Sequence, residues 1–337
     1  MAAEEGVKEA RYWEPSEKND DVDCRLCPWS CHISPGDTGI CMVRENRDGT
    51  LYSINYGRLT SVAMDPIEKK PLYHFHPGSQ IMSVGSFGCN LKCSYCQNWR
   101  ISQEKPSSQY MSPEELARTS RERQSQGNIG VAYTYNEPII FYEYVYDTAQ
   151  IVHENGQKNV MVTNGTIQPE PLADILPYID AMNVDVKSMD NAFYRKFCSG
   201  RVEPVLRTIE NAIDDCHIEI TNLLIPGEND SDKVIHELVD WIADLSPDIP
   251  LHFSAYRPAY RETIPPTGRE SLQRAFDIAS EKLHYVYVGN VHLDGTTDTH
   301  CPECGNVVIS RSGFGARVTG LDNGACAKCG RELNIIE

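Results

Sequence analysis

The chain has 337 residues, 20 prolines, 23 glycines and a formal net charge of −17. Such an acidic balance argues against a protein that works by neutralising nucleic-acid phosphates. No apolar run approaches the roughly 18 residues that a membrane span needs, and the segment from Met1 to Arg11 lacks the hydrophobic core of a signal peptide. We therefore expect a globular, cytoplasmic protein with no nucleic-acid partner, built as one large core or as a core with small appended modules.

Thirteen cysteines are present, and without a secretory signal they are better interpreted as metal ligands and reactive thiols than as disulfides. Most of them fall into three groups along the chain: Cys24, Cys27, Cys31 and Cys41; Cys89, Cys93 and Cys96; and Cys301, Cys304, Cys326 and Cys329. Cys198 and Cys216 stand apart from these groups.

Residues 1–20 are charged and lack periodicity, which predicts a loosely held arm before the first cysteine group. The four cysteines of that group stand on glycine-rich turns, so the segment cannot rely on a hydrophobic core, and bound metal would fold it. Their spacing fits a structural zinc knuckle or an auxiliary iron–sulfur cluster for electron entry, and we favour zinc. His32 adds a further potential ligand.

The stretch from Asp65 to Gly78 completes an N-terminal Cys-rich segment that we predict to span residues 1–78. Its density of proline and charge predicts an ordered loop. His74 and His76 could bind a metal there, although loop histidines usually do not.

A short buried strand, Ile81–Gly85, then delivers the second cysteine group on a tight loop, Gly88–Gln97. The spacing Cys89-x3-Cys93-x2-Cys96 lets three thiolates converge. Iron–sulfur clusters usually take four cysteine ligands, so three ligands imply an iron with a free coordination position, and an open position is a place for chemistry. The alternative is a structural metal knuckle whose fourth ligand comes from elsewhere.

From here the chain alternates strands with helices. Ser112 followed by Pro113 and two glutamates is a clear helix start. Further strands are predicted at Ile129–Tyr133, Asn159–Val162, Ala181–Val186, Ile218–Leu224 and Leu251–Ala255, with an optional short seventh at Tyr285–Val288. This alternation predicts parallel βαβ units. Residues 79–295 are thus expected to form a partial (β/α)6 TIM-like barrel, α/β in class, with one side open to a large substrate.

Polar residues follow the predicted strands at the ends where such barrels carry their chemistry. They lie in Tyr133-Thr-Tyr-Asn-Glu-Pro138, Thr163-Asn-Gly165, Asp185-Val-Lys-Ser188, Pro226–Asp230 and Tyr256–Tyr260. A single polar loop is usually ordinary. Five of them at equivalent positions, on a sheet whose first loop holds three thiolates, predict one shared site.

Residues 296–337 form a separate C-terminal module. Cys301-x2-Cys304-Gly and Cys326-x2-Cys329-Gly are paired knuckles, which is a strong zinc-ribbon signal with four ligands and no open position. A structural role is expected, and docking a partner or covering the barrel mouth are the alternatives.

Together these motifs resemble the pyruvate formate-lyase activating enzyme group of radical S-adenosylmethionine (SAM) proteins, and within it the radical SAM enzymes of the AmmeMemoRadiSam system. The resemblance is carried by the Cys24–Cys41 pattern, the Asp65–Gly78 loop, Gly88-Cys-Asn-Leu-Lys-Cys-Ser-Tyr-Cys-Gln-Asn-Trp99, Thr134–Pro138, Val184–Ser188 and Leu224–Gly227. It implies that a 4Fe-4S cluster on Cys89, Cys93 and Cys96 chelates the amino and carboxylate groups of SAM through its fourth iron.

The resemblance also implies a set of SAM contacts. Asn136 and Glu137 would lie near the SAM amino group, where the superfamily more often has Gly-Gly-Glu. Thr163, Asn164, Asp185 and Lys187 would meet the ribose and the carboxylate, with Tyr95 beside the cluster. Lysine suits a carboxylate because it is a compact charge with three donors. Arg257 stands where related enzymes often have histidine, and it would meet the adenosyl end.

The implied reaction begins when a flavodoxin- or ferredoxin-type donor reduces the cluster. SAM is then cleaved to methionine and a 5′-deoxyadenosyl radical, which removes a hydrogen atom from a substrate that is not identified by the sequence. Memo-like and Ammecr-like proteins are the implied partners. The alternatives are an activating enzyme that installs a glycyl radical on a partner, and a non-enzymatic metal-binding scaffold.

Cys198 follows the fourth predicted strand and could face the barrel mouth. It is more often a buried small residue at such a place, and the sharper hypothesis is a hydrogen-atom donor or thiyl site. Cys216 precedes an apolar strand and is assigned to the core.

Overall fold

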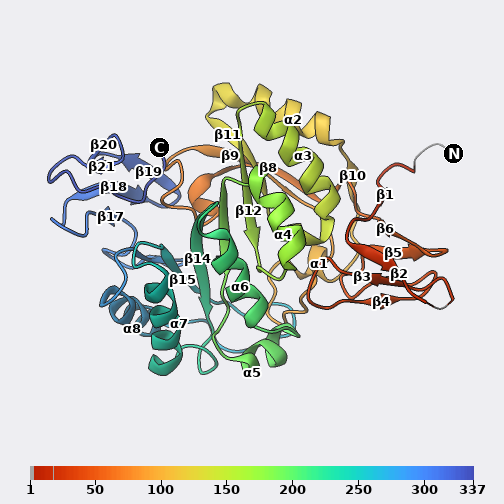
Figure 1. The fold of residues 1–337 in the computed structure, drawn as a ribbon. Helices are drawn as coiled ribbons and strands as arrows, with labels where there is room; N and C mark the ends of the chain where they lie inside the picture. Colours follow the sequence, from red (N-terminus) through yellow and green to blue (C-terminus); the bar gives the residue numbers. More distant parts are fainter. Residues whose placement is uncertain (1–3, 18) are drawn as a thin grey trace.

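The computed structural model describes residues 4–17 and 19–337. Residues 1–3, which begin the expected arm, and residue 18 lie outside the described residues. A sheet of eight strands forms the centre of the described chain, in the order β16-β15-β14-β13-β12-β11-β9-β8 (Figure 1). Its strands are β8 (Ser61–Pro66), β9 (Gln80–Gly85), β11 (Asn128–Tyr133), β12 (Lys158–Thr163), β13 (Ala181–Asp185), β14 (His217–Leu224), β15 (Leu251–Ala255) and β16 (Val286–Gly289).

Neighbouring strands from β9 to β16 are parallel, and β8 pairs antiparallel with β9 at the edge. Six parallel strands were counted from the sequence, whereas the described residues contain seven, because the optional strand is present as β16. No hydrogen-bonded ladder joins β16 to β8 within residues 4–17 and 19–337. The sheet is therefore open, as expected of an incomplete barrel.

Helices follow the strands and pack along the sheet, with α2, α3, α4 and α6 side by side in Figure 1. Their bounds are α1 (Trp99–Ser102), α2 (Pro113–Glu122), α3 (Tyr142–Glu154), α4 (Pro169–Ile175), α5 (Asn191–Phe193), α6 (Glu203–Ala212), α7 (Asp232–Leu245) and α8 (Arg269–Ser280). Shorter turns are η1 (Ile67–Lys69), η2 (Gln124–Gln126), η3 (Pro138–Phe141), η4 (Leu176–Tyr178) and η5 (Tyr194–Cys198), the last a π-helix. The predicted start of α2 is confirmed, since Ser112 Oγ accepts from the backbone N–H of Glu115 at 3.2 Å.

The N-terminal segment folds into small sheets beside the barrel. Its strands are β1 (Lys8–Glu9), β2 (Trp13–Pro15), β3 (Val22–Cys24), β4 (His32–Ile33), β5 (Arg44–Arg47), β6 (Thr50–Ser53) and β7 (Arg58–Leu59), the last paired with β10 (Gln109–Tyr110). The expectation of a loose arm is wrong for the described residues, because β1 pairs with β6 and β2 with β3. Ala10, between those strands, is buried. The arm could not be predicted because two- and three-residue strands leave no periodicity to detect.

The C-terminal module packs at the opposite side of the barrel from the N-terminal segment (Figure 1). It contains β17 (Thr299–His300), β18 (Val307–Ser312), β19 (Gly315–Val318), β20 (Leu321–Asp322) and β21 (Ala325–Cys326). Its tail lies along the 65–78 loop, where Ile336 N donates to His74 O at 2.8 Å. Arg311 reaches from β18 to Tyr73 O at 2.6 Å. Because this loop lies before β9, the module covers the amino ends of the strands, and the alternative that it covers the barrel mouth is wrong.

A buried polar network joins the module to the sheet. Glu219 of β14 accepts hydrogen bonds from His74 N at 2.7 Å and is paired with His252 Nε2 at 2.6 Å. The ring of His74 contacts Tyr287 Oη at 2.7 Å through Nε2 and Asn334 O at 2.9 Å through Nδ1. Both ring nitrogens of His74 are thus engaged by protein groups, so His74 has a docking role in place of the metal-binding role that the sequence allowed.

The buried ring of His74 makes stability depend on pH. Burial, opposed by Glu219, lowers the pKa of His74 to about 3, whereas an unfolded histidine titrates near 6.5. Between these values the unfolded chain binds more protons, so the stability is present above about pH 6.5 and is lost as the pH falls, by up to about 1.4 kcal/mol per unit.

We expect the thermal midpoint to fall from pH 7 to pH 5.5, and to fall less steeply in His74→Gln, which cannot be protonated. Differential scanning fluorimetry of both proteins across this range checks the prediction. If the thermal midpoints of the two proteins fell equally with pH, His74 would not be the source of the pH dependence of stability.

No helix among residues 4–17 and 19–337 has both the length and the apolar character needed to span a bilayer.

Candidate active site

The second cysteine group lies at the carboxyl end of β9, on the loop that leads to α1. It opens onto a cavity of about 610 Å³ that is lined by residues from the ends of several parallel strands. They include Cys89, Cys93, Tyr95, Cys96, Asn136, Glu137, Thr163, Asn164, Asp185 and Lys187. The structure therefore brings the three thiolates and all but one of the predicted SAM contacts into one cavity.

Asn136 holds the start of the cysteine loop. Its Oδ1 accepts from Ser86 N at 2.8 Å, and its Nδ2 donates to Gly88 O at 3.1 Å. Gly88 has a φ of +87°, which favours glycine. The amide of Asn136 is thus occupied by the loop backbone, and we assign it the positioning of Cys89 in place of a direct contact with an amino group.

The far side of the loop rests on η5. Lys92 N donates to Cys198 O at 2.8 Å, and Ser94 N donates to Phe197 O at 2.8 Å. The Cys198 side chain is buried, lies 3.4 Å from Tyr95 Oη, and is absent from the lining of the cavity among the described residues. The thiol of Cys198 therefore lies beside Tyr95, and the role of Cys198 in hydrogen-atom transfer stays a prediction. This favours the buried small residue over the hydrogen-atom donor.

Glu137 is the buried carboxylate of the cavity. Its Oε1 accepts from Thr163 Oγ1 at 2.6 Å and its Oε2 from Asn164 N at 2.8 Å, so both residues fix its orientation. Burial raises the pKa of Glu137 to about 7, although these hydrogen bonds oppose the rise. A carboxylate held in this way suits a cationic ligand group, whose charge would stabilise the ionised form.

Lys187 is the cation that faces the loop. Its Nζ lies 2.8 Å from Asp185 Oδ2. Burial opposes the charge of Lys187, but the carboxylate of Asp185 leads the groups that raise its pKa well above the usual range. The cavity therefore presents a buried carboxylate and a charged ammonium group, which together match a zwitterionic ligand such as an amino acid.

Arg257 is the predicted contact that the structure does not bring to the cavity. Its side chain is exposed and its nearest hydrogen-bond acceptor is Asn290 O at 3.5 Å. Among the described residues, Arg257 is therefore not part of the lining of the cavity. Asn290, which follows β16, lines the cavity instead.

Sequence reasoning missed Lys69 and Lys70, which line the cavity together with Tyr135. Asp65 organises them, accepting from Lys70 Nζ at 2.7 Å and from Tyr135 Oη at 2.6 Å. The signal that could have found them was the Lys69-Lys70 pair in a loop that was predicted to be ordered. Because this lysine pair precedes β9, the alternation of strands and helices did not indicate that it would lie at the cavity.

Two cysteine groups differ in how tightly they converge. Cys301, Cys304, Cys326 and Cys329 have sulfur atoms that all lie within 4.8 Å of one another, with Sγ–Sγ distances of 3.6 and 3.7 Å in two pairs. A tetrahedral ion with bonds of about 2.3 Å separates its thiolates by about 3.8 Å. The C-terminal group therefore has the size of a single-ion site.

Cys89, Cys93 and Cys96 do not form such a compact set, although every one of them lies in the described chain. In a polynuclear cluster each thiolate binds a different iron, so its sulfur atoms stand farther apart than those around one ion. The wider spacing, the three ligands and the adjoining cavity fit an iron–sulfur cluster with an open iron.

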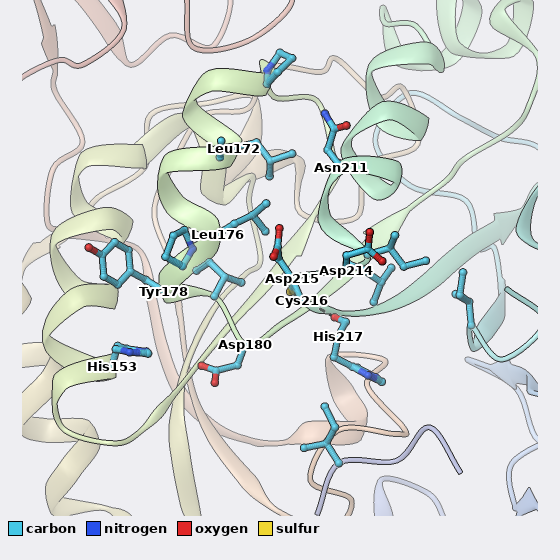
Figure 2. A pocket seen from close by; sticks show the side chains of 18 of the residues that line it. His153, Leu172, Leu176, Tyr178, Asp180, Asn211, Asp214, Asp215, Cys216 and His217 are labelled. Atoms are coloured by element: carbon cyan, nitrogen blue, oxygen red, sulfur yellow. Dashed lines mark hydrogen bonds between the residues drawn. The ribbon is translucent and has the colours of Figure 1, made fainter. Parts of the chain in front are cut away.

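A second and larger cavity, of about 1000 Å³, lies at the amino ends of β13 and β14 (Figure 2). Asp180, Cys216 and His217 line it together with Tyr178 and His153. It is remote from the cysteine loop, and parallel α/β sheets carry their chemistry at the carboxyl ends of the strands. We therefore assign the chemistry to the smaller cavity.

Comparison with known proteins agrees with this geometry. The family model of the radical SAM superfamily matches residues 83–242. The uncharacterized protein MJ0808 of Methanocaldococcus jannaschii is 42% identical over 339 aligned residues, covering 98% of this chain and 100% of that protein. The GTP 3′,8-cyclase of Geobacter sulfurreducens is 30% identical over 267 residues, covering 70% of this chain and 78% of the cyclase.

Among solved structures, Streptococcus suis SuiB bound to S-adenosylmethionine superimposes with a TM-score of 0.53. The match covers 67% of this chain and 53% of SuiB at 16% sequence identity. At this identity the likeness concerns the fold.

Proposed function

Because the chain belongs to the radical SAM superfamily of enzymes, we propose that Cys89, Cys93 and Cys96 hold a 4Fe-4S cluster at which SAM is cleaved reductively. When bound, the cluster supplies the electron that converts SAM to methionine and a 5′-deoxyadenosyl radical, which takes a hydrogen atom from the substrate. The observation that carries the proposal is that three thiolates, Glu137 and Lys187 line one cavity.

The protein's own residues would orient the methionine end of SAM. The carboxylate of Glu137, fixed by Thr163 and Asn164, would accept from the SAM amino group. Lys187, supported by Asp185, would donate to the SAM carboxylate. The two opposite charges within one cavity would favour one orientation of SAM, with its sulfonium toward the cysteine loop.

The proposal is tested by supplying anaerobically reconstituted protein with dithionite and SAM and measuring 5′-deoxyadenosine. Formation of 5′-deoxyadenosine and methionine is expected. A protein that carries iron and binds SAM but releases neither product would support the metal-binding scaffold and contradict the enzyme.

The charge of Glu137 is expected to be needed for SAM affinity. Glu137→Gln keeps the shape but removes the charge, and a hydrogen bond to a charged group contributes about 1.5–3 kcal/mol, so SAM should bind roughly ten- to a hundredfold more weakly. Equilibrium dialysis with labelled SAM measures the change. Arg257→Ala is the control and should bind SAM like the parent, because Arg257 lies outside the cavity. If Glu137→Gln bound SAM with the affinity of the parent, the Glu137 carboxylate would not contribute to SAM binding.

Within the superfamily we propose the AmmeMemoRadiSam assignment, with Memo-like and Ammecr-like partners and a flavodoxin- or ferredoxin-type electron donor. The motifs from Cys24 to Cys41 and from Thr134 to Pro138 support it. Adjacent genes for Memo-like and Ammecr-like proteins would agree with this assignment, whereas an adjacent glycyl radical enzyme would favour the activating role. For the C-terminal module we propose zinc, which the sulfur spacing of a single-ion site supports.

A further inference from the structure

The four cysteines of the N-terminal segment come together beside the catalytic loop. Cys24 ends β3 and donates its backbone N–H to Cys31 O at 2.9 Å. The turn that leads to Cys41 passes over Cys31, since a Cβ placed on Gly39 would lie 3.5 Å from Cys31 Sγ. His32, the other potential ligand, is engaged elsewhere, with Nδ1 2.9 Å from Asp23 and Nε2 3.1 Å from Asp21. The donor set is therefore four thiolates.

The sulfur atoms of these cysteines are less tightly gathered than those of the C-terminal module. No three of the N-terminal cysteines, all of them in the described chain, bring their sulfur atoms within 4.8 Å of one another, whereas the C-terminal four do. A zinc ion would need the closer spacing. We infer that Cys24, Cys27, Cys31 and Cys41 bind a second iron–sulfur cluster, where the sequence alone favoured zinc.

Arg44 supports a cluster over a single ion. Its side chain is buried, and its terminal nitrogens donate to Glu143, with Nη1 at 3.1 Å from Oε1. Its Nε is also buried, yet no described residue accepts a hydrogen bond from it, the thiols included. Cys24 and Cys41 lie within electrostatic reach of this guanidinium. Leaving a buried donor without an acceptor destabilises the fold. An iron–sulfur cluster brings inorganic sulfides that can accept this hydrogen bond, whereas zinc brings no acceptor.

The N-terminal group touches the catalytic loop directly. A Cβ on Gly88 would lie 2.5 Å from Cys41 O, so the backbone after Cys41 is packed against the residue before Cys89. Trp29 Nε1 donates to Asn90 O at 2.7 Å. Cys41 O thus contacts Gly88, and the Cα atom of Gly88 is about 3.8 Å from that of Cys89. This short path connects a ligand of the N-terminal group with a ligand of the catalytic loop.

This path suits one-electron transfer, a role that rests on the proposed function. A flavodoxin- or ferredoxin-class donor would give one electron to the N-terminal cluster. When that electron passed on, the N-terminal cluster would return to its oxidised form and the catalytic cluster would be reduced.

The inference is tested by metal and sulfide analysis of the full chain, purified and reconstituted without oxygen. The parent is expected to hold about eight iron ions with a similar number of acid-labile sulfides and about one zinc ion. Cys89→Ala/Cys93→Ala/Cys96→Ala should keep about half of the iron and sulfide and take up about one electron per chain from dithionite, against about two for the parent.

A parent with about four iron ions and about two zinc ions would overturn the inference, whether or not the triple variant folds. Loss of all iron from a folded triple variant would overturn it as well. These outcomes are separate from the test of the proposed function. A protein that holds both clusters but forms no 5′-deoxyadenosine would contradict the proposed function and leave the inference of a second cluster standing. Cys216→Ala, in a buried cysteine outside all three groups, should leave every count unchanged.

Discussion

Replacing Cys93 by alanine is expected to abolish 5′-deoxyadenosine formation. Cys93 is the middle of three thiolates that line the cavity, and its loop is held by backbone hydrogen bonds from its two neighbours, Lys92 and Ser94, to η5. A cluster with two remaining cysteine ligands would lose the geometry that leaves one iron open. Because the chemistry depends on that iron, the residual activity should fall below detection, and the iron content should fall by about half.

Cys216→Ala is the matched control for this variant. Cys216 is buried at the amino end of the sheet and lies outside the cysteine groups, so its removal should leave both activity and iron content unchanged. The measurements are product chromatography and iron analysis on the same preparations. If Cys93→Ala formed 5′-deoxyadenosine at the parental rate, the loop would not be the site of SAM cleavage.

Replacing Gly88 by alanine is expected to have the second largest effect. The residue has a φ of +87°, where an alanine costs about 1–2 kcal/mol. In addition, the new Cβ would lie 2.5 Å from Cys41 O and 2.8 Å from Val43 Cγ1. The backbone would have to move, and with it Cys89 on one side and Cys41 on the other. We expect at least a tenfold loss of activity together with loss of iron.

Gly156→Ala is the control that distinguishes the effect of backbone strain from the effect of the contact between residue 88 and Cys41. Gly156 has a φ of +70°, and its Cβ would meet nothing within 4 Å. The control should therefore show the cost of the left-handed conformation as a lower thermal midpoint, while iron content and activity stay at parental levels. Equal loss of iron in both variants would contradict the contact between the N-terminal segment and the catalytic loop.

Much of the site could be predicted because its residues have fixed places in a repeating pattern. The carboxyl ends of parallel strands meet at one edge of a sheet, so Glu137, Thr163, Asp185 and Lys187 can be grouped from the sequence. The three cysteines followed from their spacing alone.

Other parts depend on turns that have no periodic signal. The direction of the chain after β15 decides that Arg257 is exposed, and the π-helix decides that Cys198 faces inward. Neither direction is encoded in residue spacing. The place of the C-terminal module depends on tertiary contacts between His74, Glu219 and the tail, which are distant in sequence.

The choice between zinc and iron at Cys24–Cys41 was also beyond the sequence. Both metals accept four thiolates at such spacings. The looser gathering of the sulfur atoms and the unpaired Nε of Arg44 support the inferred cluster.

The central claim is that the Cys89–Cys96 loop holds a cluster with one iron open to SAM. Electron paramagnetic resonance of the dithionite-reduced protein, recorded with and without SAM, tests it most directly. SAM is expected to change the signal that disappears in Cys89→Ala/Cys93→Ala/Cys96→Ala and to leave any remaining cluster signal as it was. A spectrum that SAM does not alter, at concentrations where SAM is bound, would contradict the claim.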